Sequence, residues 1–448
     1  MRLFHLPMEI QEAIVAQVAS PASLANLARV CRQLQPLAER ILYQSVYLRN
    51  GTGDKFAYAI DRAPNRAMFV RELLIHYHYV DVPDEESYYP FYAESLAPTI
   101  GRLVNLQSLV VKGLEYDAPR EYDDDTTEGF ERVIEEAEKW RHLFTQSAVS
   151  GSRILPSLTK CVLAMNDLDH SEPPWSFDMR ASVMIHPHLQ DLTIVGARIS
   201  SMEESLMASR RSTELESLVL VCCDVSSRSI HDLLSLPRGL KHLAVKGAAW
   251  TVRPYYYMKN RQEYIDALSI QAESLTSLDM DFPPGVPDNP ALDFRALQRL
   301  QKLTVDPQAL RGDGKFDPVS EQVCLWENSE PICRLPPTIQ HLVFFEYHEA
   351  KTPDLHTLLL VYNWISQGSL PNLRSITVKT ARSSADAILN RGFEDNSGRS
   401  FYEAFQTFRV ELRAERTLSS TENGYRFFDC HCGYVSWRIA GIHFIPVR

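Results

Sequence analysis

The sequence lacks long apolar runs. No stretch approaches the roughly 18 consecutive apolar residues that a membrane-spanning helix needs, and the start, MRLFHLPMEI, has no apolar core of signal-peptide length. Apolar residues make up 45% of the chain and charged residues 23%, which is the balance of a folded protein rather than a disordered one. We therefore expect a soluble protein of the cytoplasm, the nucleus or both.

Cysteines and catalytic motifs are also scarce. The chain of 448 residues has eight cysteines, and Cys31, Cys161, Cys324 and Cys333 lie far apart, so no disulfide framework is indicated. The phosphate-binding loop, the dinucleotide-binding glycine pattern and the metalloprotease and serine-hydrolase motifs are all missing from the sequence. We expect a reduced protein that is not an enzyme and takes no cofactor.

Two stretches invite a metal-binding interpretation. Residues 430–432 read Cys-His-Cys and residues 76–79 read His-Tyr-His-Tyr. Structural zinc takes four ligands, usually as two separated pairs, and neither stretch has a second pair or a helpful carboxylate at suitable spacing. Strands with alternating exposure explain both stretches better, so we predict no metal site.

The negative charge is concentrated in one place. The net charge is -11, and residues 114–138 alone contain eleven acidic residues against two arginines. An acidic chain is poorly suited to bind nucleic acid or anionic membranes. The acidic run 121–125 could recruit a basic partner, although such runs are more often solvated loops.

A six-residue unit of the form apolar-polar-polar-apolar-x-apolar recurs along most of the chain. All first, fourth and sixth positions are apolar, and all second and third positions are polar. Side chains alternate along a strand, so each unit predicts a short strand with one dry face. The units are VRELLI (70–75), LQSLVV (106–111), LTKCVL (158–163), LQDLTI (189–194), LESLVL (215–220), LKHLAV (240–245), LTSLDM (275–280), LQKLTV (300–305), IQHLVF (339–344) and LRSITV (373–378).

The repeat resembles the leucine-rich repeat, whose unit runs L-x-x-L-x-L-x-x-N/C. Two units carry the likeness in full: Leu158, Cys161, Leu163 and Asn166, then Leu215, Leu218, Leu220 and Cys223. Other units depart from the Asn/Cys position, which is held by Leu114, Ala197, Ala248, Pro283 and Ala381. The resemblance implies a solenoid, and these departures imply looser turns and irregular repeats of the fungal type.

The predicted fold class is α/β, with about ten strand–helix units. We assign residues 1–50 to a helical domain, 51–380 to the solenoid and 381–448 to a capping segment that closes the open core. Insertions interrupt the solenoid at 114–154, which includes a helix from Thr127 to about Ala148, and at 281–294 and 306–336. In the cap, 398–416 predicts a helix and 425–447 two strands.

The first fifty residues predict three short helices: 8–18, a second that opens with Ser20 as N-cap and Pro21, and about 35–46. So small a segment cannot bury all its apolar residues, which indicates a partner. The alternative is a helical cap on the first repeat.

This segment resembles the F-box. The ordered likeness runs through Leu6-Pro7, Glu9-Ile10, the LxxLxxVCR block at 24–32, Leu37-Ala38 and Leu42-Tyr43. The resemblance implies binding to a Skp-family adaptor and, through it, a cullin ligase. The residues expected to contact the adaptor are Leu6, Pro7, Glu9, Ile10, Ile14, Leu24, Leu27, Val30 and Leu34.

An F-box followed by leucine-rich repeats implies a substrate-recognition subunit of an SCF-type ubiquitin ligase. The repeats would then hold an unknown protein substrate, since a ribbon of about ten strands is on the order of 45 Å long and suits a protein better than a small molecule. The alternative is a repeat scaffold or ligand-binding protein without a ligase role. The candidate substrate contacts, at the third, fifth and seventh positions of the concave face, are Lys112, Lys160, Asp191, His242, Lys246, Asp279, Lys302 and His341.

Overall fold

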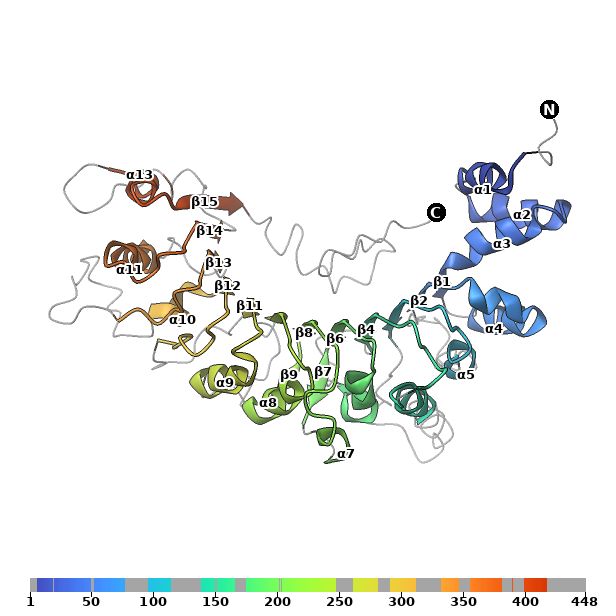
Figure 1. Ribbon diagram of the computed structural model, residues 1–448, viewed down its shortest axis with the longest axis horizontal. Coiled ribbons are helices and arrows are strands. Elements are labelled where there is room, and N and C mark those ends of the chain that lie inside the picture. The colour runs from blue at the N-terminus through green and yellow to red at the C-terminus, as the bar shows by residue number, and fades with distance from the viewer. Residues whose placement is uncertain are drawn as a thin grey trace, which may run out of the picture. The chain divides into compact units, whose positions relative to one another are not determined.

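The structure is a computed structural model (Figure 1). It describes residues 6–18, 20–49, 52–76, 96–113, 138–149, 151–165, 175–200, 202, 204–246, 261–280, 291–311, 332–345, 355–380, 389 and 399–416. These residues form two compact units. The first holds residues 6–197 and 212–215, and the second holds 198–211 and 216–416.

Three helices open the first unit: α1 (Met8–Ala16), α2 (Pro21–Val30) and α3 (Gln35–Gln44). The Ser20 side chain accepts the backbone N–H of Ser23 at 3.4 Å, with Pro21 at the start of α2, as the sequence predicts. The third helix is shorter than predicted. It ends at Gln44, and the chain passes directly into strand β1 (Ser45–Arg49).

The first unit continues with a ladder of five parallel strands. In spatial order these are β1, β2 (Glu72–His76), β3 (Ser108–Lys112), β4 (Lys160–Ala164) and β6 (Asp191–Val195). The short elements between them are α4 (Gly53–Arg62), η2 (Pro64–Met68), α5 (Ala97–Ile100), β5 (Trp175–Ser176) and η4 (Asp178–Ile185). We call this group of five strands the first ladder.

The second unit holds a ladder of seven parallel strands, which we call the second ladder. They are β8 (Ser217–Val221), β10 (His242–Lys246), β11 (Ser277–Met280), β12 (Lys302–Val305), β13 (His341–Phe345), β14 (Ser375–Thr380) and β15 (Glu411–Arg416). Helices α8 and α9 lie along one side of these strands (Figure 1). The remaining elements are β7 (Ala197–Ile199), α7 (Glu204–Met207), β9 (Asp224–Val225), α8 (Ser227–Ser235), α9 (Arg261–Leu268), η7 (Ser269–Gln271), α10 (Pro307–Arg311), α11 (Leu355–Ser366) and α13 (Phe401–Gln406).

The third to sixth positions of all ten hexapeptides lie on strands of the two ladders. The apolar side chains at their first, fourth and sixth positions are all buried, none with more than 7% of its surface exposed. The backbone hydrogen bonds between successive repeats also recur. The carbonyl of the second position accepts two successive backbone N–H groups of the next repeat, as the Thr159 carbonyl does from Gln190 and Asp191 at 2.8 and 3.0 Å. The solenoid character therefore follows from one repeated local pattern.

Two strands of the ladders were not predicted, and neither were the short strands β5, β7 and β9. Strand β1 lies within the segment that we had assigned to the third helix and to the helical domain, and β15 lies within the predicted helix 398–416. The helix prediction is confirmed for α13 (Phe401–Gln406), where Ser400 and Glu403 form a capping box, and it is wrong for residues 411–416, where buried Leu412 alternates with exposed Glu411 and Arg413, as a strand requires. The ladders therefore hold twelve strands where the sequence predicted about ten units.

The insertions are described only in part. Residues 138–147 are helical, and Trp140 and Phe144 are both fully buried with ring centroids 5.9 Å apart, so this portion of the predicted helix is confirmed. Residues 114–137, 281–290, 312–331 and 417–448 lie outside the described residues, and so do the predicted strands at 425–447. Within the described part of the chain, no helix has the length and hydropathy of a membrane span.

Candidate protein-binding surfaces

The face of each ladder that carries the third, fifth and seventh repeat positions is called its open face. The register aligns these positions from strand to strand: Ser108, Lys160 and Asp191 are third-position neighbours in the first ladder. In the second ladder the corresponding row is Ser217, His242, Ser277, Lys302, His341, Ser375 and Glu411. Side chains from different repeats therefore form continuous rows.

The structure places seven of the eight candidate substrate residues at solvent. Lys160, His341 and Asp279 are half-buried, and Asp191, His242, Lys246 and Lys302 are exposed. Lys246 Nζ lies 2.8 Å from an Asp279 carboxylate oxygen, so these two charges neutralise each other. The expectation for Lys112 was wrong: it is only 5% exposed and is not available to a large partner.

The three N-terminal helices enclose a small core of their own. Its buried members are Val15, Leu24, Leu34, Leu37 and Ala38. Two of the predicted adaptor contacts, Leu24 at 5% and Leu34 at 3% exposure, therefore hold the helices together and do not present a contact surface. Leu27 is partly buried against the same cluster.

The other predicted adaptor residues face solvent. Pro7 and Glu9 are exposed, and Ile10, Ile14 and Val30 are exposed by 46%, 41% and 81%. Leu6 is half-buried, with its carbonyl accepting the Gln11 side-chain amide at 2.8 Å. Sequence reasoning missed Met8, which is 62% exposed although it stands inside the LPMEI motif. Exposed large apolar side chains on a folded segment are typical of a protein-binding surface.

Arg66 fastens these helices to the first ladder. From η2, its guanidinium lies 2.7 Å from Glu39 on α3, donates to the Ala59 carbonyl at 3.1 Å and lies over the Tyr43 ring at 5.3 Å. The Arg66 hydrogen bond lowers the pKa of the Glu39 carboxyl, and burial raises the pKa of Tyr43. Together with the direct passage from α3 into β1, this fixes the helices to the first strand.

An F-box-like family model matches residues 3–49. The match therefore covers the three helices, their small core, the exposed apolar side chains and strand β1. We call α1, α2 and α3 the F-box-like helices from here on. A comparison with curated proteins finds no match.

Two solved structures show weak likeness. A leucine-rich-repeat protein of Leptospira interrogans is 13% identical, with a TM-score of 0.29 over 80% of this chain and 81% of that chain. A sugar phosphate isomerase/epimerase from Parabacteroides distasonis is 8% identical, with a TM-score of 0.15 over 86% of this chain and 92% of that chain. Both TM-scores are too low to support an argument.

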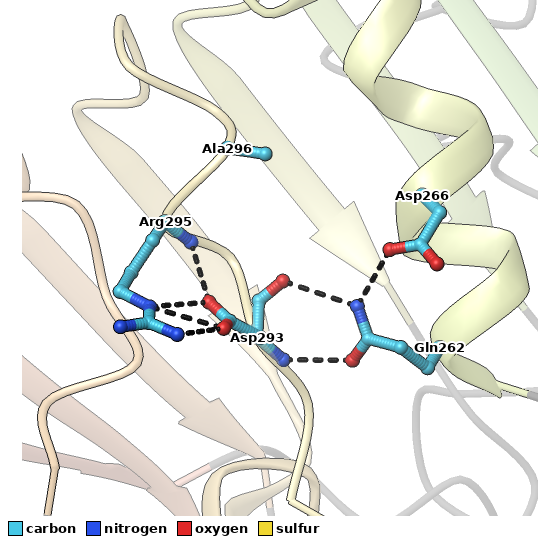
Figure 2. A pocket seen from close by; sticks show the side chains of 5 residues that line it. All are labelled: Gln262, Asp266, Asp293, Arg295 and Ala296. Atoms are coloured by element: carbon cyan, nitrogen blue, oxygen red, sulfur yellow. Dashed lines mark hydrogen bonds and ion pairs between the residues drawn. The ribbon is translucent and has the colours of Figure 1, made fainter.

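Beyond the F-box-like helices, one shallow depression of about 450 Å³ lies beside α9 (Figure 2). Gln262 donates to Asp266 at 2.8 Å and accepts the backbone N–H of Asp293 at 2.9 Å. The Arg295 guanidinium donates to the Asp293 carboxylate at 3.0 Å and thereby lowers the pKa of Asp293. The polar groups of this depression thus bind one another and stabilise the loop, rather than forming an evident ligand site.

The metal and cysteine candidates are only partly covered by the structure. Residues 77–79 and 430–432 lie outside the described residues. His76 accepts or donates a hydrogen bond with the Tyr47 hydroxyl at 3.2 Å across β1 and β2. Cys223 is 7% exposed and its thiol donates to the Val221 carbonyl at 3.4 Å, which is the turn role that the repeat position implies. Among the described residues no cluster of metal-ligating side chains occurs.

Proposed function

We propose that this protein is the substrate-recognition subunit of an SCF-type E3 ubiquitin ligase. The observation that carries the proposal is the F-box-like match at residues 3–49 together with exposed apolar side chains on the matched helices. In this reading the F-box-like helices bind a Skp-family adaptor, which links them to a cullin ligase. The protein itself catalyses no reaction.

The open faces would hold the protein substrate. Their solvent-accessible charges are of both signs in the first ladder, with half-buried Lys160 and exposed Asp191 in neighbouring third positions. Mixed charges on a broad surface favour specific recognition of another protein over general adhesion. The proposal places the protein where such ligases work, in the cytoplasm, the nucleus or both, with neither a nucleic acid nor a membrane as partner.

The packed contact between the F-box-like helices and the first ladder supports separate roles for the two, adaptor binding and substrate binding. A receptor must hold its substrate at a defined distance from the machinery that modifies it. Arg66 bonds α3 through Glu39 and the preceding helix α4 through Ala59, while α3 continues into β1 without a linker. The adaptor surface and the first ladder are thus parts of one packed body.

The test is capture of a purified Skp-family adaptor by the full chain. We expect Ile10→Asp with Ile14→Asp to abolish capture, because two charges would be buried in an apolar interface. Neither residue belongs to the buried core of the helices, so the fold should survive.

The matched control is Val149→Asp, which places a charge at a position that is 61% exposed outside the F-box-like helices. It should capture the adaptor as well as the original chain does. Undiminished capture by the Ile10 and Ile14 double variant would contradict the proposal. Failure of the unaltered chain to capture any Skp-family adaptor would favour a repeat scaffold without a ligase role.

A further inference from the structure

The third-position row of the second ladder has an unusual composition. From β8 to β14 it reads Ser217, His242, Ser277, Lys302, His341 and Ser375, each aligned with the next in the strand register. None of the six is buried. Each of these six side chains can donate a hydrogen bond and none is a carboxylate; the first carboxylate of the row is Glu411, on β15.

Acidic residues next to this row are neutralised by partners. Asp279, in the fifth position, pairs with Lys246 at 2.8 Å, and Glu216, at a second position, pairs with Lys241 at 2.6 Å. At the far end of the row, Glu411 pairs with Arg413 at 2.7 Å. Lys302 has no ion pair with a described residue, so it adds a positive charge that the described neighbours do not balance.

The side chains of the row are also partly pre-arranged. His341 Nδ1 lies 2.8 Å from Ser375 Oγ, a contact between neighbouring strands that fixes the imidazole ring. With Nδ1 engaged, Nε2 is the ring nitrogen that can meet a ligand. Lys302 stands beside His341 on the adjacent strand, at a strand spacing of about 4.8 Å. An anionic oxygen placed between them would meet two donors.

We propose that this row binds an extended, anionic segment of a partner protein. Six strands span about 24 Å, which an extended chain covers with about seven residues. Carboxylate or phosphate oxygens on such a segment would receive hydrogen bonds from Lys302, from His341 Nε2–H when Nδ1 accepts the Ser375 hydroxyl, and from the hydroxyls of Ser217 and Ser277. The inference rests on the proposed function, because it gives the substrate of the open face a chemical class.

Nucleic acid also carries anionic oxygens, but the row does not favour it. Nucleic-acid surfaces combine many cations, whereas this chain has a net charge of -11 and one lysine in the row. A short peptide with a few negative side chains matches the number of donors better.

The test measures binding of labelled heptapeptides to the purified full chain by fluorescence anisotropy. One peptide alternates Glu and Ala, so that all carboxylates share one face of the extended chain. A second has phosphoserine in place of Glu, and a third has Gln. We expect at least one anionic peptide to bind and the Gln peptide to bind more than about tenfold more weakly.

Lys302→Glu should weaken binding of the anionic peptide at least about tenfold, and Lys302→Gln should weaken it by an intermediate factor. Lys160→Glu, the same change at the same repeat position of the first ladder, is the matched control and should alter binding less than about twofold. Tighter binding of the phosphoserine peptide would identify phosphate as the recognised group, and equal or tighter binding of the Glu peptide would identify carboxylate.

Equal binding of all three peptides, or equal losses in the Lys302 and Lys160 variants, would overturn the proposal. Tighter binding of a single-stranded oligothymidine than of either anionic peptide would assign the row to nucleic acid instead. Adaptor capture is measured on the same preparations. If capture persists while peptide binding fails, only this inference is lost; if the unaltered chain captures no adaptor, the ligase role is lost.

Discussion

In the first ladder the third-position row contains carboxylates beside a lysine, at Glu72, Lys160 and Asp191, whereas in the second ladder no carboxylate occurs in it before Glu411. The fourth and sixth positions are nevertheless apolar and buried in all ten hexapeptide repeats. Burial thus restricts the inner positions to apolar residues, while the residue type at the open-face positions can differ between the ladders.

The fifth-position rows differ as well. Val110 and Val162 of the first ladder are apolar and only 3% exposed. At the same position of the second ladder Asp279 is half-buried and holds an ion pair with Lys246. The fifth position therefore accepts a buried valine in one strand and a paired carboxylate in another, which changes the chemistry of the open face at these strands.

The largest effect is expected from the shared interior. Leu109→Ala on β3 and Leu278→Ala on β11 each remove a fourth-position side chain that is 0% exposed. Each should lower the free energy of unfolding by about 3 kcal/mol, because a cavity adds to the lost burial. Denaturant unfolding measures the loss, and hydrogen exchange should localise it to the ladder that carries the substitution.

If both substitutions cost the same, the two interiors are equivalent in energy as well as in pattern. A cost below about 1 kcal/mol for only one of them would show that its ladder relaxes around the cavity. The comparison of the ladders would then extend to their cores.

A smaller effect is expected at the junction that only the first ladder has. Arg66→Met should destabilise the F-box-like helices by about 2 kcal/mol, because the half-buried Glu39 carboxylate loses its partner. The matched control is Arg40→Met, since the Arg40–Glu12 pair is more exposed and such pairs contribute less than about 1 kcal/mol.

Hydrogen exchange of α3 and of the second ladder distinguishes the outcomes. Faster exchange in α3 with unchanged exchange in β10–β12 would confirm the local role of Arg66. If the Arg66 and Arg40 variants lost equal stability, the Arg66 guanidinium would contribute no more than a surface charge does.

The smallest effect concerns pH and again involves the first unit. Burial lowers the pKa of His186 to about 4, and its ring nitrogens are occupied by the Leu155 carbonyl at 3.1 Å and the backbone N–H of His188 at 3.3 Å. The unfolded chain therefore takes up the proton first as the pH falls below about 6.5. We expect the free energy of unfolding to fall by about 1 to 2 kcal/mol between pH 7 and pH 5. Above about pH 6.5 this contribution to stability should be present almost in full.

The measurement is the free energy of unfolding of the original chain and of His186→Gln at both pH values. The variant is less stable at pH 7 but should lose less on acidification, because it has no group to protonate at this site. An identical pH dependence in both proteins would assign the acid sensitivity to other groups.

The hexapeptide pattern could be recognised from sequence because strand alternation is a local property. Each repeat defines its own buried face within six residues, and ten of the twelve ladder strands were found in this way. The ordered F-box-like residues were equally visible, and residues 3–49 match an F-box-like family model. What the sequence could not give was the role of each residue in that set, since exposed and buried leucines look alike in one dimension.

Sequence by itself therefore determined a repeated strand with three buried apolar positions, preceded by three helices. Tertiary structure decided that Ser45–Arg49 forms a strand, because its backbone pairs with β2 in parallel register and Leu48 is buried there. It also decided that Leu24 and Leu34 are core residues, that Lys112 is buried and that Lys246 is neutralised by Asp279. These outcomes depend on residues brought together from different repeats, and such contacts are not encoded in any single local pattern.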